Sequence, residues 1–395
     1  MEAREAELLA QANAQCQDPA FRDAVWRHLR YRGESASVTE LSTRIHPNDQ
    51  MLQHSLRHFR EVNRSVSQYF NVALQQHNAA QQVFRLALGV PNAAHRLLDF
   101  ACGYGRLLRF LTLSVPPRQI AAAEIQRDAV DFVVEQFGVH GILSDFEPHR
   151  FEPGARFDFV WVASLFSHLP RHTFDGWLAR LTSILVPDGI LCFSVHDECL
   201  LPPHIPMPAD GIHFIPSSEN ADLDSSAYGT TFVNEAFVRA AVARARGIDH
   251  PCFRIGRGLA NEQDLYIVPA RPDRDLGPLS AFRKGAWGWV DEWRVSDAGE
   301  LYMRGWAASI DDGPLNAIEI SIDGALHRCP VGLPRDDVRT VLNDTRLGMS
   351  GWDFRRPLGP GPAHAFVTVT ARSARDEAAL LYAGPVTRPP RSAER

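Results

Sequence analysis

An acidic, glycine-containing turn over residues 99–106 constrains the fold of this chain more than any other feature of its sequence. The turn follows the apolar pair at 97–98 and leads into an apolar run over 107–111. A strand that ends on an acid and turns into a helix brings backbone N–H groups close to a nucleotide-like ligand. Glycine permits this approach because it has no Cβ. Gly103 and Gly105 therefore predict the ligand-binding turn of an α/β sheet.

Two common phosphate-binding motifs do not fit this turn. The dinucleotide fingerprint needs a small residue three positions after its second glycine, where this chain has Leu108. The P-loop needs a Gly-Lys-Ser/Thr sequence, and none follows the turn. The turn instead resembles the first motif of the class I S-adenosylmethionine-dependent methyltransferases, acid-x-Gly-x-Gly-x-Gly, with Ala101 at the first glycine position. Alanine is tolerated there if its φ is negative.

Further segments follow in the order and spacing of that family. They are a buried strand over 119–124, an amphipathic helix over 127–137, strands over 141–146 and 157–163, and a Pro-Asp-Gly turn with a fifth strand within 181–193. The continuous apolar character of 157–163 is typical of a parallel strand that is covered on both faces. The predicted fold class is α/β, a Rossmann-like doubly wound sheet of a class I methyltransferase. The alternative is another nucleotide-binding α/β sheet.

The resemblance implies S-adenosylmethionine as the cofactor and assigns residues to it. Glu124 would accept hydrogen bonds from the ribose hydroxyls. Asp145 would face the exocyclic amine of adenine, with a neighbouring apolar residue over the ring. The full implied set is Asp99, Phe100, Ala101, Cys102, Gly103, Gly105, Arg106, Glu124, Ile125, Ser144, Asp145, Phe146, Ala163, Ser164 and Leu165.

Two segments resemble one particular group within that family. Residues 98–106 and 160–169 resemble a bacterial methyltransferase group associated with cell-surface polysaccharide genes, and the similarity extends over about residues 67–269. It implies a small-molecule or glycan acceptor, methylated on a hydroxyl of a saccharide or surface-glycan precursor. Two alternatives stay open: methylation of an amine, and a non-catalytic module that binds glycan or protein partners.

A hydroxyl acceptor must lose a proton, and histidine is the base best matched to neutral pH. His168 follows the fourth predicted strand, and His196 ends the fifth. Both therefore lie at the edge where α/β sheets bind ligands. Either could be the catalytic base, although His168 could instead only cap a helix. We expect no metal, because Pro170 disturbs the helical pairing of His168 with His172.

Composition sets the wider limits. A chain of 395 residues with 45% hydrophobic content can bury a large core and form two or more domains. A net charge of −6 argues against a nucleic-acid partner. No apolar run reaches the roughly 18 residues of a transmembrane helix. Six scattered cysteines without a CxxC pair fit reduced thiols in the cytoplasm. The oligomeric state stays open.

The pattern predicts four parts along the chain. They are a helical N-terminal extension over 1–90, the methyltransferase domain over 91–270, a linker over 271–284 and a C-terminal β-sandwich domain over 285–390. In the second part, the proline-rich segment 196–228 predicts a long loop that acts as an acceptor-binding lid. A helix over 232–246 and two antiparallel edge strands near 252–255 and 264–268 would follow it.

The last part resembles β domains that are appended to bacterial enzymes of surface-glycan assembly. Its alternating strands and turn residues predict the sandwich. Five of the eight tryptophans lie in it: Trp287, Trp289, Trp293, Trp306 and Trp352. Exposed tryptophans would stack on sugar rings, and buried ones would fill the core.

Overall fold

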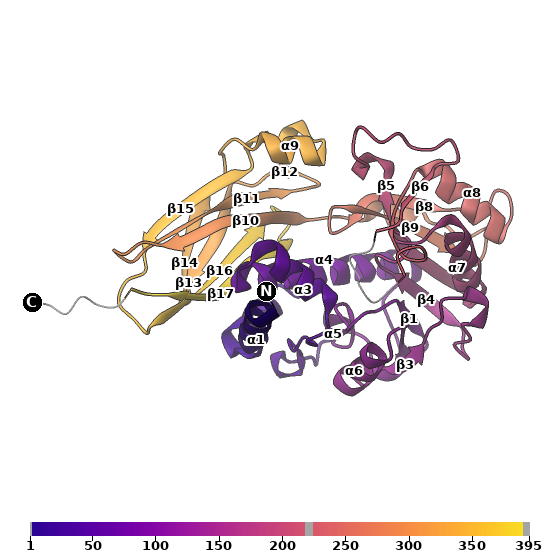
Figure 1. Ribbon diagram of the computed structural model, residues 1–395, viewed down its shortest axis with the longest axis horizontal. Helices are drawn as coiled ribbons and strands as arrows, with labels where there is room; N and C mark the ends of the chain where they lie inside the picture. Colours follow the sequence, from indigo (N-terminus) through magenta and orange to yellow (C-terminus); the bar gives the residue numbers. More distant parts are fainter. Residues whose placement is uncertain (1, 218–223, 390–395) are drawn as a thin grey trace, which may run out of the picture. The chain divides into compact units, whose positions relative to one another are not determined.

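The computed structural model describes residues 2–217 and 224–389, and the chain divides into two compact units (Figure 1). One unit comprises residues 31–42 and 75–282, and is called the sheet unit below. The other comprises residues 1–30, 43–74 and 283–395, and is called the sandwich unit. Within the described residues, no helix combines the length and the apolar character needed to cross a membrane.

Within the described residues, the sheet unit is built on a nine-stranded sheet of order β3-β2-β1-β4-β5-β7-β6, with β9 pairing β5 and β8. Strands β1 to β5 pair in parallel, and β9 runs antiparallel to β5. This topology confirms the predicted doubly wound α/β sheet. The strands are β1 (Leu97–Phe100), β2 (Ile120–Glu124), β3 (His140–Leu143), β4 (Phe157–Val162), β5 (Leu185–Asp197), β6 (Ile212–Ile215), β7 (Thr230–Val233), β8 (Phe253–Leu259) and β9 (Gln263–Pro269).

Helices cover both faces of this sheet, which explains why its central strands are continuously apolar. Leu97 packs on one face with side chains of α4, α5 and α6. The next residue, Leu98, packs on the opposite face with side chains of α7 and α8. The helices are α4 (Val62–Leu88), of which residues 75–88 belong to this unit, α5 (Leu108–Leu111), α6 (Arg127–Phe137), α7 (Arg171–Ser183) and α8 (Glu235–Arg246).

The expected Pro-Asp-Gly turn before the fifth strand is wrong. Residues 187–189 lie inside β5, where the pairing with β4 shifts register. A Cβ on Gly189 would lie 2.7 Å from the carbonyl oxygen of Phe157. The three residues therefore form a close-packed irregularity within the strand rather than a turn that precedes it.

The predicted lid is not a long loop. Its segment 196–228 contains β6, which pairs antiparallel with β7, and β7 pairs with the end of β5. Residues 218–223 of the predicted lid lie outside the described residues. Phe232, expected in a helix, lies in β7, and α8 begins after Asn234, whose Oδ1 accepts the Phe237 N–H at 2.9 Å. The two predicted edge strands are confirmed as β8 and β9.

The sandwich unit holds two antiparallel four-stranded sheets within the described residues, coloured orange to yellow in Figure 1. Met303 of one sheet and Ile320 and Val369 of the other share one core. The strands are β10 (Ala286–Val295), β11 (Glu300–Ser309), β12 (Gly313–Pro314), β13 (Ala317–Ile322), β14 (Ala325–Pro330), β15 (Gly351–Pro357), β16 (His364–Arg372) and β17 (Ala378–Thr387). The helices are α1 (Glu2–Gln17), α2 (Pro19–Arg27), α3 (Gln50–Phe59) and α9 (Asp336–Leu342).

The N-terminal helices belong to this unit up to residue 74, so the predicted boundary at residue 90 does not coincide with the division of the chain. Side-chain amides provide the physical reason. Gln15 Nε2 donates to the carbonyl oxygen of Ala383 at 2.9 Å, and Asn63 Nδ2 donates to the Tyr382 hydroxyl at 2.8 Å. These amides bind helices from one end of the chain to β17 near the other end.

Three of the six tryptophans of this unit are buried. They are Trp287, Trp306 and Trp352. Trp293 is half-buried and donates from Nε1 to a carboxylate oxygen of Glu61 at 3.1 Å. Burial of three rings favours the packing interpretation over a stacking platform for sugars.

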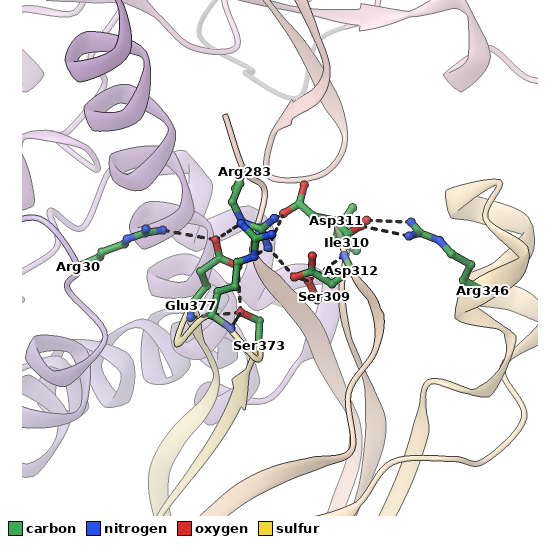
Figure 2. A network of polar contacts seen from close by, with 11 residues as sticks. Arg30, Arg283, Ser309, Ile310, Asp311, Asp312, Arg346, Ser373 and Glu377 are labelled. Atoms are coloured by element: carbon green, nitrogen blue, oxygen red, sulfur yellow. Dashed lines mark hydrogen bonds and ion pairs between the residues drawn. The ribbon is translucent and has the colours of Figure 1, made fainter. Parts of the chain in front are cut away.

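Glu377 is the centre of a polar network in the sandwich unit (Figure 2). It is 5% exposed, and its Oε1 accepts from Arg283 Nε at 2.6 Å, while its Oε2 accepts from the Ser373 hydroxyl at 2.9 Å. Arg283 also donates to Asp312 at 2.5 Å. Burial acts to raise the pKa of Glu377, but the bonds from Arg283 and Ser373 outweigh it and lower that pKa. The network connects the start of the 283–395 segment to its last hairpin.

We expect Glu377→Gln to lower the free energy of unfolding by about 2–4 kcal/mol, because it leaves the Arg283 guanidinium without its buried carboxylate. Urea unfolding of the full chain, followed by tryptophan fluorescence, measures this loss. The control is Asp376→Asn, which removes an ion pair to Arg372 from a carboxylate that is 84% exposed. It should change stability by less than about 1 kcal/mol. Equal effects of the two substitutions would contradict the structural role of the network.

Candidate active site

The glycine turn follows β1 directly, and its backbone is left-handed at three positions. Ala101, Gly103 and Gly105 have φ of 57°, 53° and 75°. A Cβ on Gly105 would lie 2.4 Å from Cε2 of Phe137, so this glycine also permits the turn to pack on α6. A Cβ on Gly103 would meet no described atom within 4 Å. Gly103 therefore borders open space, and it is there that a ligand can approach the backbone.

Ala101 does not have the negative φ at which alanine is tolerated without strain. At 57° this residue lies in the left-handed region, which costs an L-residue roughly 1–2 kcal/mol relative to glycine. The following N–H, that of Cys102, donates to the carbonyl oxygen of Ala123 at 3.2 Å. This bond ties the strained turn to β2.

Ala101 offers a test of this strain. Ala101→Gly should keep the stability of the chain within about 1 kcal/mol, because relief of strain offsets the greater freedom of the unfolded chain. Ala101→Val should destabilise by more than about 1 kcal/mol, since a β-branched side chain is strongly disfavoured at positive φ. Thermal unfolding of the ligand-free protein compares the two. Equal melting temperatures would contradict the left-handed conformation.

Glu124 ends β2 and faces the turn. Its Oε2 accepts the Gly103 N–H at 2.9 Å, and its Oε1 accepts the Ile125 N–H at 2.7 Å. The side chain is buried, and burial raises the pKa of Glu124 although these backbone bonds oppose the rise. The ends of β1 and β2 are therefore joined through one carboxylate beside the open space at Gly103.

Asp99 is the third of the four residues of β1 and lies close to the turn. It is 3% exposed. In the described part of the chain, its Oδ2 is buried and has no hydrogen-bond partner. Burial and the nearby Glu124 raise the pKa of Asp99 to about 8, against the opposing charge of Arg106. A buried, unpartnered carboxyl oxygen next to the turn is a position where a ligand group can bind.

The segment after β3 presents an acid beside an exposed ring. The Ser144 N–H donates to the carbonyl oxygen of Glu124 at 2.8 Å, which holds the segment against β2. Asp145 accepts the Glu147 N–H through Oδ1 at 2.9 Å. Phe146 is 54% exposed. An apolar ring left in solvent is a surface on which an adenine can stack.

His168 lies in the segment after β4, together with the predicted residues 163–165. Its Nδ1 lies 2.6 Å from the carbonyl oxygen of Gly229, and the Tyr228 ring stacks on the imidazole at 4.6 Å and 19°. Because a carbonyl only accepts, Nδ1 carries the proton and Nε2 carries the basic lone pair. Gly229 and Tyr228, which precede β7, therefore hold the His168 ring in place.

His196 lies near the end of β5, and its ring centroid is 6.0 Å from that of His168. Gln263 contacts its Nε2 at 3.2 Å, and Phe232 packs against it at 5.5 Å between centroids. Burial, followed by the charge of His168, lowers the pKa of His196 to about 4. The structure therefore brings the two predicted histidines together, with His196 neutral.

Asp197, the acid next to His196, binds an arginine rather than the imidazole. Asp197 forms an ion pair with Arg254 at 2.7 Å, and Arg254 also binds Glu235 and Asp264. This cluster stabilises the ends of β5, β8 and β9. Within residues 2–217 and 224–389, no group of three histidine, cysteine, aspartate or glutamate side chains is arranged to hold a metal ion.

Gln263 and Tyr228 were not predicted. Neither belongs to a motif, and both reach the histidines from far along the chain. The one available signal was polarity, because Gln263 begins an otherwise mainly apolar strand. Polarity alone does not say which distant side chain a residue will contact.

Comparison with known proteins shows what part of the sheet unit resembles. Residues 97–189 match a family model described as a methyltransferase domain. Similar solved structures include SAM-bound CalS10, an amino pentose methyltransferase from Micromonospora echinaspora (18% identity, 50% of this chain and 92% of that chain, TM-score 0.36). They also include the sugar N-methyltransferase KedS8 from Streptoalloteichus sp. ATCC 53650 (18% identity, 50% and 88%, TM-score 0.37) and DesVI from Streptomyces venezuelae (17% identity, 50% and 91%, TM-score 0.37). No curated protein matches the sequence.

Proposed function

We propose that this protein is an S-adenosylmethionine-dependent methyltransferase that methylates a hydroxyl group of a saccharide or surface-glycan precursor, with His168 as the general base. The observation that carries the proposal is the bond between His168 Nδ1 and the carbonyl oxygen of Gly229. That bond leaves the basic lone pair on Nε2, as a proton acceptor requires. A cytoplasmic location agrees with the six cysteines, none of which forms a disulfide within the described residues.

The residues around the turn fit the cofactor. Asp99 has an unpartnered oxygen, Gly103 borders open space, and Glu124 places a carboxylate between them. Glu124 would hold the ribose, and Asp145 with Phe146 would hold the adenine. When bound, the cofactor supplies an electrophilic methyl group on a cationic sulfur.

Asp99 makes cofactor binding depend on pH. Because its pKa is about 8 in the ligand-free domain, Asp99 is protonated at pH 7 and should release this proton when a cationic ligand binds nearby. Affinity should therefore rise with pH, at most about tenfold per unit, and level off above about pH 8. Calorimetric titration in buffers of different ionisation enthalpy counts the released protons. Asp99→Asn should abolish the dependence, and an equal pH dependence in wild type and variant would contradict this role.

The surroundings of His168 suit a neutral, ring-shaped acceptor. Tyr228 and Phe232 place aromatic rings beside the two histidines, and such rings bind the apolar faces of sugars. His168 Nε2 would accept the proton that the acceptor hydroxyl loses. Alignment of the two reactants and exclusion of water provide the remaining rate enhancement.

A panel of acceptors tests the proposal. The full chain is incubated with isotopically labelled S-adenosylmethionine and with neutral sugars, amino sugars and nucleotide-linked sugars, and products are identified by mass spectrometry. Label on the oxygen of a neutral sugar, lost in His168→Gln, would support it. Label only on amines would overturn the hydroxyl acceptor, and cofactor binding without transfer to any sugar would overturn the saccharide class.

A further inference from the structure

The side-chain amide of Gln263 joins the ends of two parallel strands. Gln263 is the first residue of β9, and its amide contacts Ser164 after β4 and Ser194 and His196 on β5. Ser194 is fully buried, and Ser164 has a left-handed backbone with φ of 57°. The amide therefore lies among groups whose own positions are tightly constrained.

The Gln263 amide is fully hydrogen-bonded, whereas the buried Nδ1 of His196 has no hydrogen-bond partner among the described residues. The Ser194 hydroxyl oxygen accepts the Ser164 N–H at 2.7 Å, and its own hydrogen is donated to Gln263 Oε1 at 2.6 Å. The two hydrogens on Gln263 Nε2 then have two acceptors, the Ser164 hydroxyl oxygen at 3.1 Å and His196 Nε2 at 3.2 Å. Gln263 Oε1 also lies 3.3 Å from the Ser164 hydroxyl oxygen. In this orientation each polar group of the amide therefore has a partner of the right kind.

The orientation decides the form of His196. An Nε2 that accepts an N–H cannot carry a proton, so the imidazole is neutral with its hydrogen on Nδ1. Burial and the charge of His168 favour the same neutral form, and they lower the pKa of His196. A positively charged His196 at a centroid distance of 6.0 Å would make His168 harder to protonate. A neutral His196 leaves His168 as the basic imidazole of the pair.

We infer that Gln263 is a positioning residue that holds His196 neutral and protonated on Nδ1, so that His168 can act as the base. The role of His168 rests on the proposed function, whereas the state of His196 does not. The effect of Gln263 is exerted through His196 and the turn at Ser164, with no contact to the reacting atoms required.

Nitrogen NMR of the labelled full-length protein tests the inference without an activity assay. In the wild type, we expect the shifts of an unprotonated Nε2 and a protonated Nδ1 for His196, assigned with a His196→Gln variant. Gln263→Met removes the donor and should release the tautomer preference. Gln263→Glu supplies an acceptor, so Nε2 should become protonated and the pKa of His196 should rise from about 4 to roughly 6 or above. A wild type protonated on Nε2, or an unchanged tautomer in Gln263→Met, would overturn the inference.

Kinetics provide the second readout. The acidic limb of the kcat/KM profile should move to higher pH in Gln263→Glu, while calorimetric affinity for S-adenosylmethionine stays within about threefold. The control is Gln53→Met on α3. It removes an amide that donates to the carbonyl oxygen of Pro47, and it should leave the profile unchanged. If the wild type did not bind S-adenosylmethionine, the proposed function would be refuted. The NMR result would still decide the protonation state of His196.

Discussion

Replacing His168 with glutamine is expected to lower kcat by about 10²- to 10⁴-fold, the range for loss of a general base. Glutamine retains an N–H for the carbonyl oxygen of Gly229, now bonded by His168 Nδ1 at 2.6 Å. It has no nitrogen that binds a proton near neutral pH. Initial rates with the acceptor found in the panel measure the loss, and calorimetry should show cofactor affinity unchanged within about threefold.

The matched control is His172→Gln, an exposed histidine on α7 four residues further along the chain. It should keep near-normal turnover. If His168→Gln and His196→Gln both kept normal turnover, a histidine base would be ruled out. If only His196→Gln lost activity, the base would be His196, and the inference for Gln263 would fall with it.

Replacing Glu124 with alanine is expected to weaken S-adenosylmethionine binding about 100-fold. The carboxylate ends β2 beside the turn and already accepts the Gly103 N–H at 2.9 Å. Hydrogen bonds to a charged acceptor contribute about 1.5–3 kcal/mol each, so loss of the ribose contacts accounts for this change. Gly103→Arg should have a similar effect, because its side chain would occupy the space that borders Gly103. Calorimetric titration measures both affinities.

The control is Asp131→Ala, which removes a negative charge from an exposed position on α6, the helix that follows β2. It should bind the cofactor as the wild type does. Melting temperatures of all three variants separate a damaged site from a damaged fold. Normal binding by a folded Glu124→Ala variant would place the cofactor elsewhere.

Local pattern was sufficient for the centre of the sheet. Strands β1, β2 and β4 and helix α6 were predicted closely because each is buried along its whole length or on one face. The apolar residues therefore repeat with the period of the element itself. Asp99 lies near the end of β1, Glu124 ends β2, and Asp145 follows β3. These acids share one edge of the sheet, since the carboxyl ends of parallel strands meet there.

The region of the predicted lid was less predictable, because local pattern is weak there. Strands β6 and β7 are four residues each, and their pairing depends on the end of β5 rather than on their own composition. Short strands have too few residues for a periodic signal. Ala101 presents a similar case at the scale of one residue: its backbone conformation follows from the bond between Cys102 and Ala123, which no local propensity expresses.

The sequence by itself determined the α/β sheet, the glycine turn and the acids at the strand ends, because buried faces and close backbone approach restrict residue type at regular intervals. Only the tertiary structure decided which nitrogen of His168 carries the proton, that Gln263 bonds His196, and that the N-terminal helices pack with β17. These outcomes depend on single hydrogen bonds between residues about 60 to 370 positions apart. Such a bond requires only a donor and an acceptor, and many polar residues in the chain could provide either.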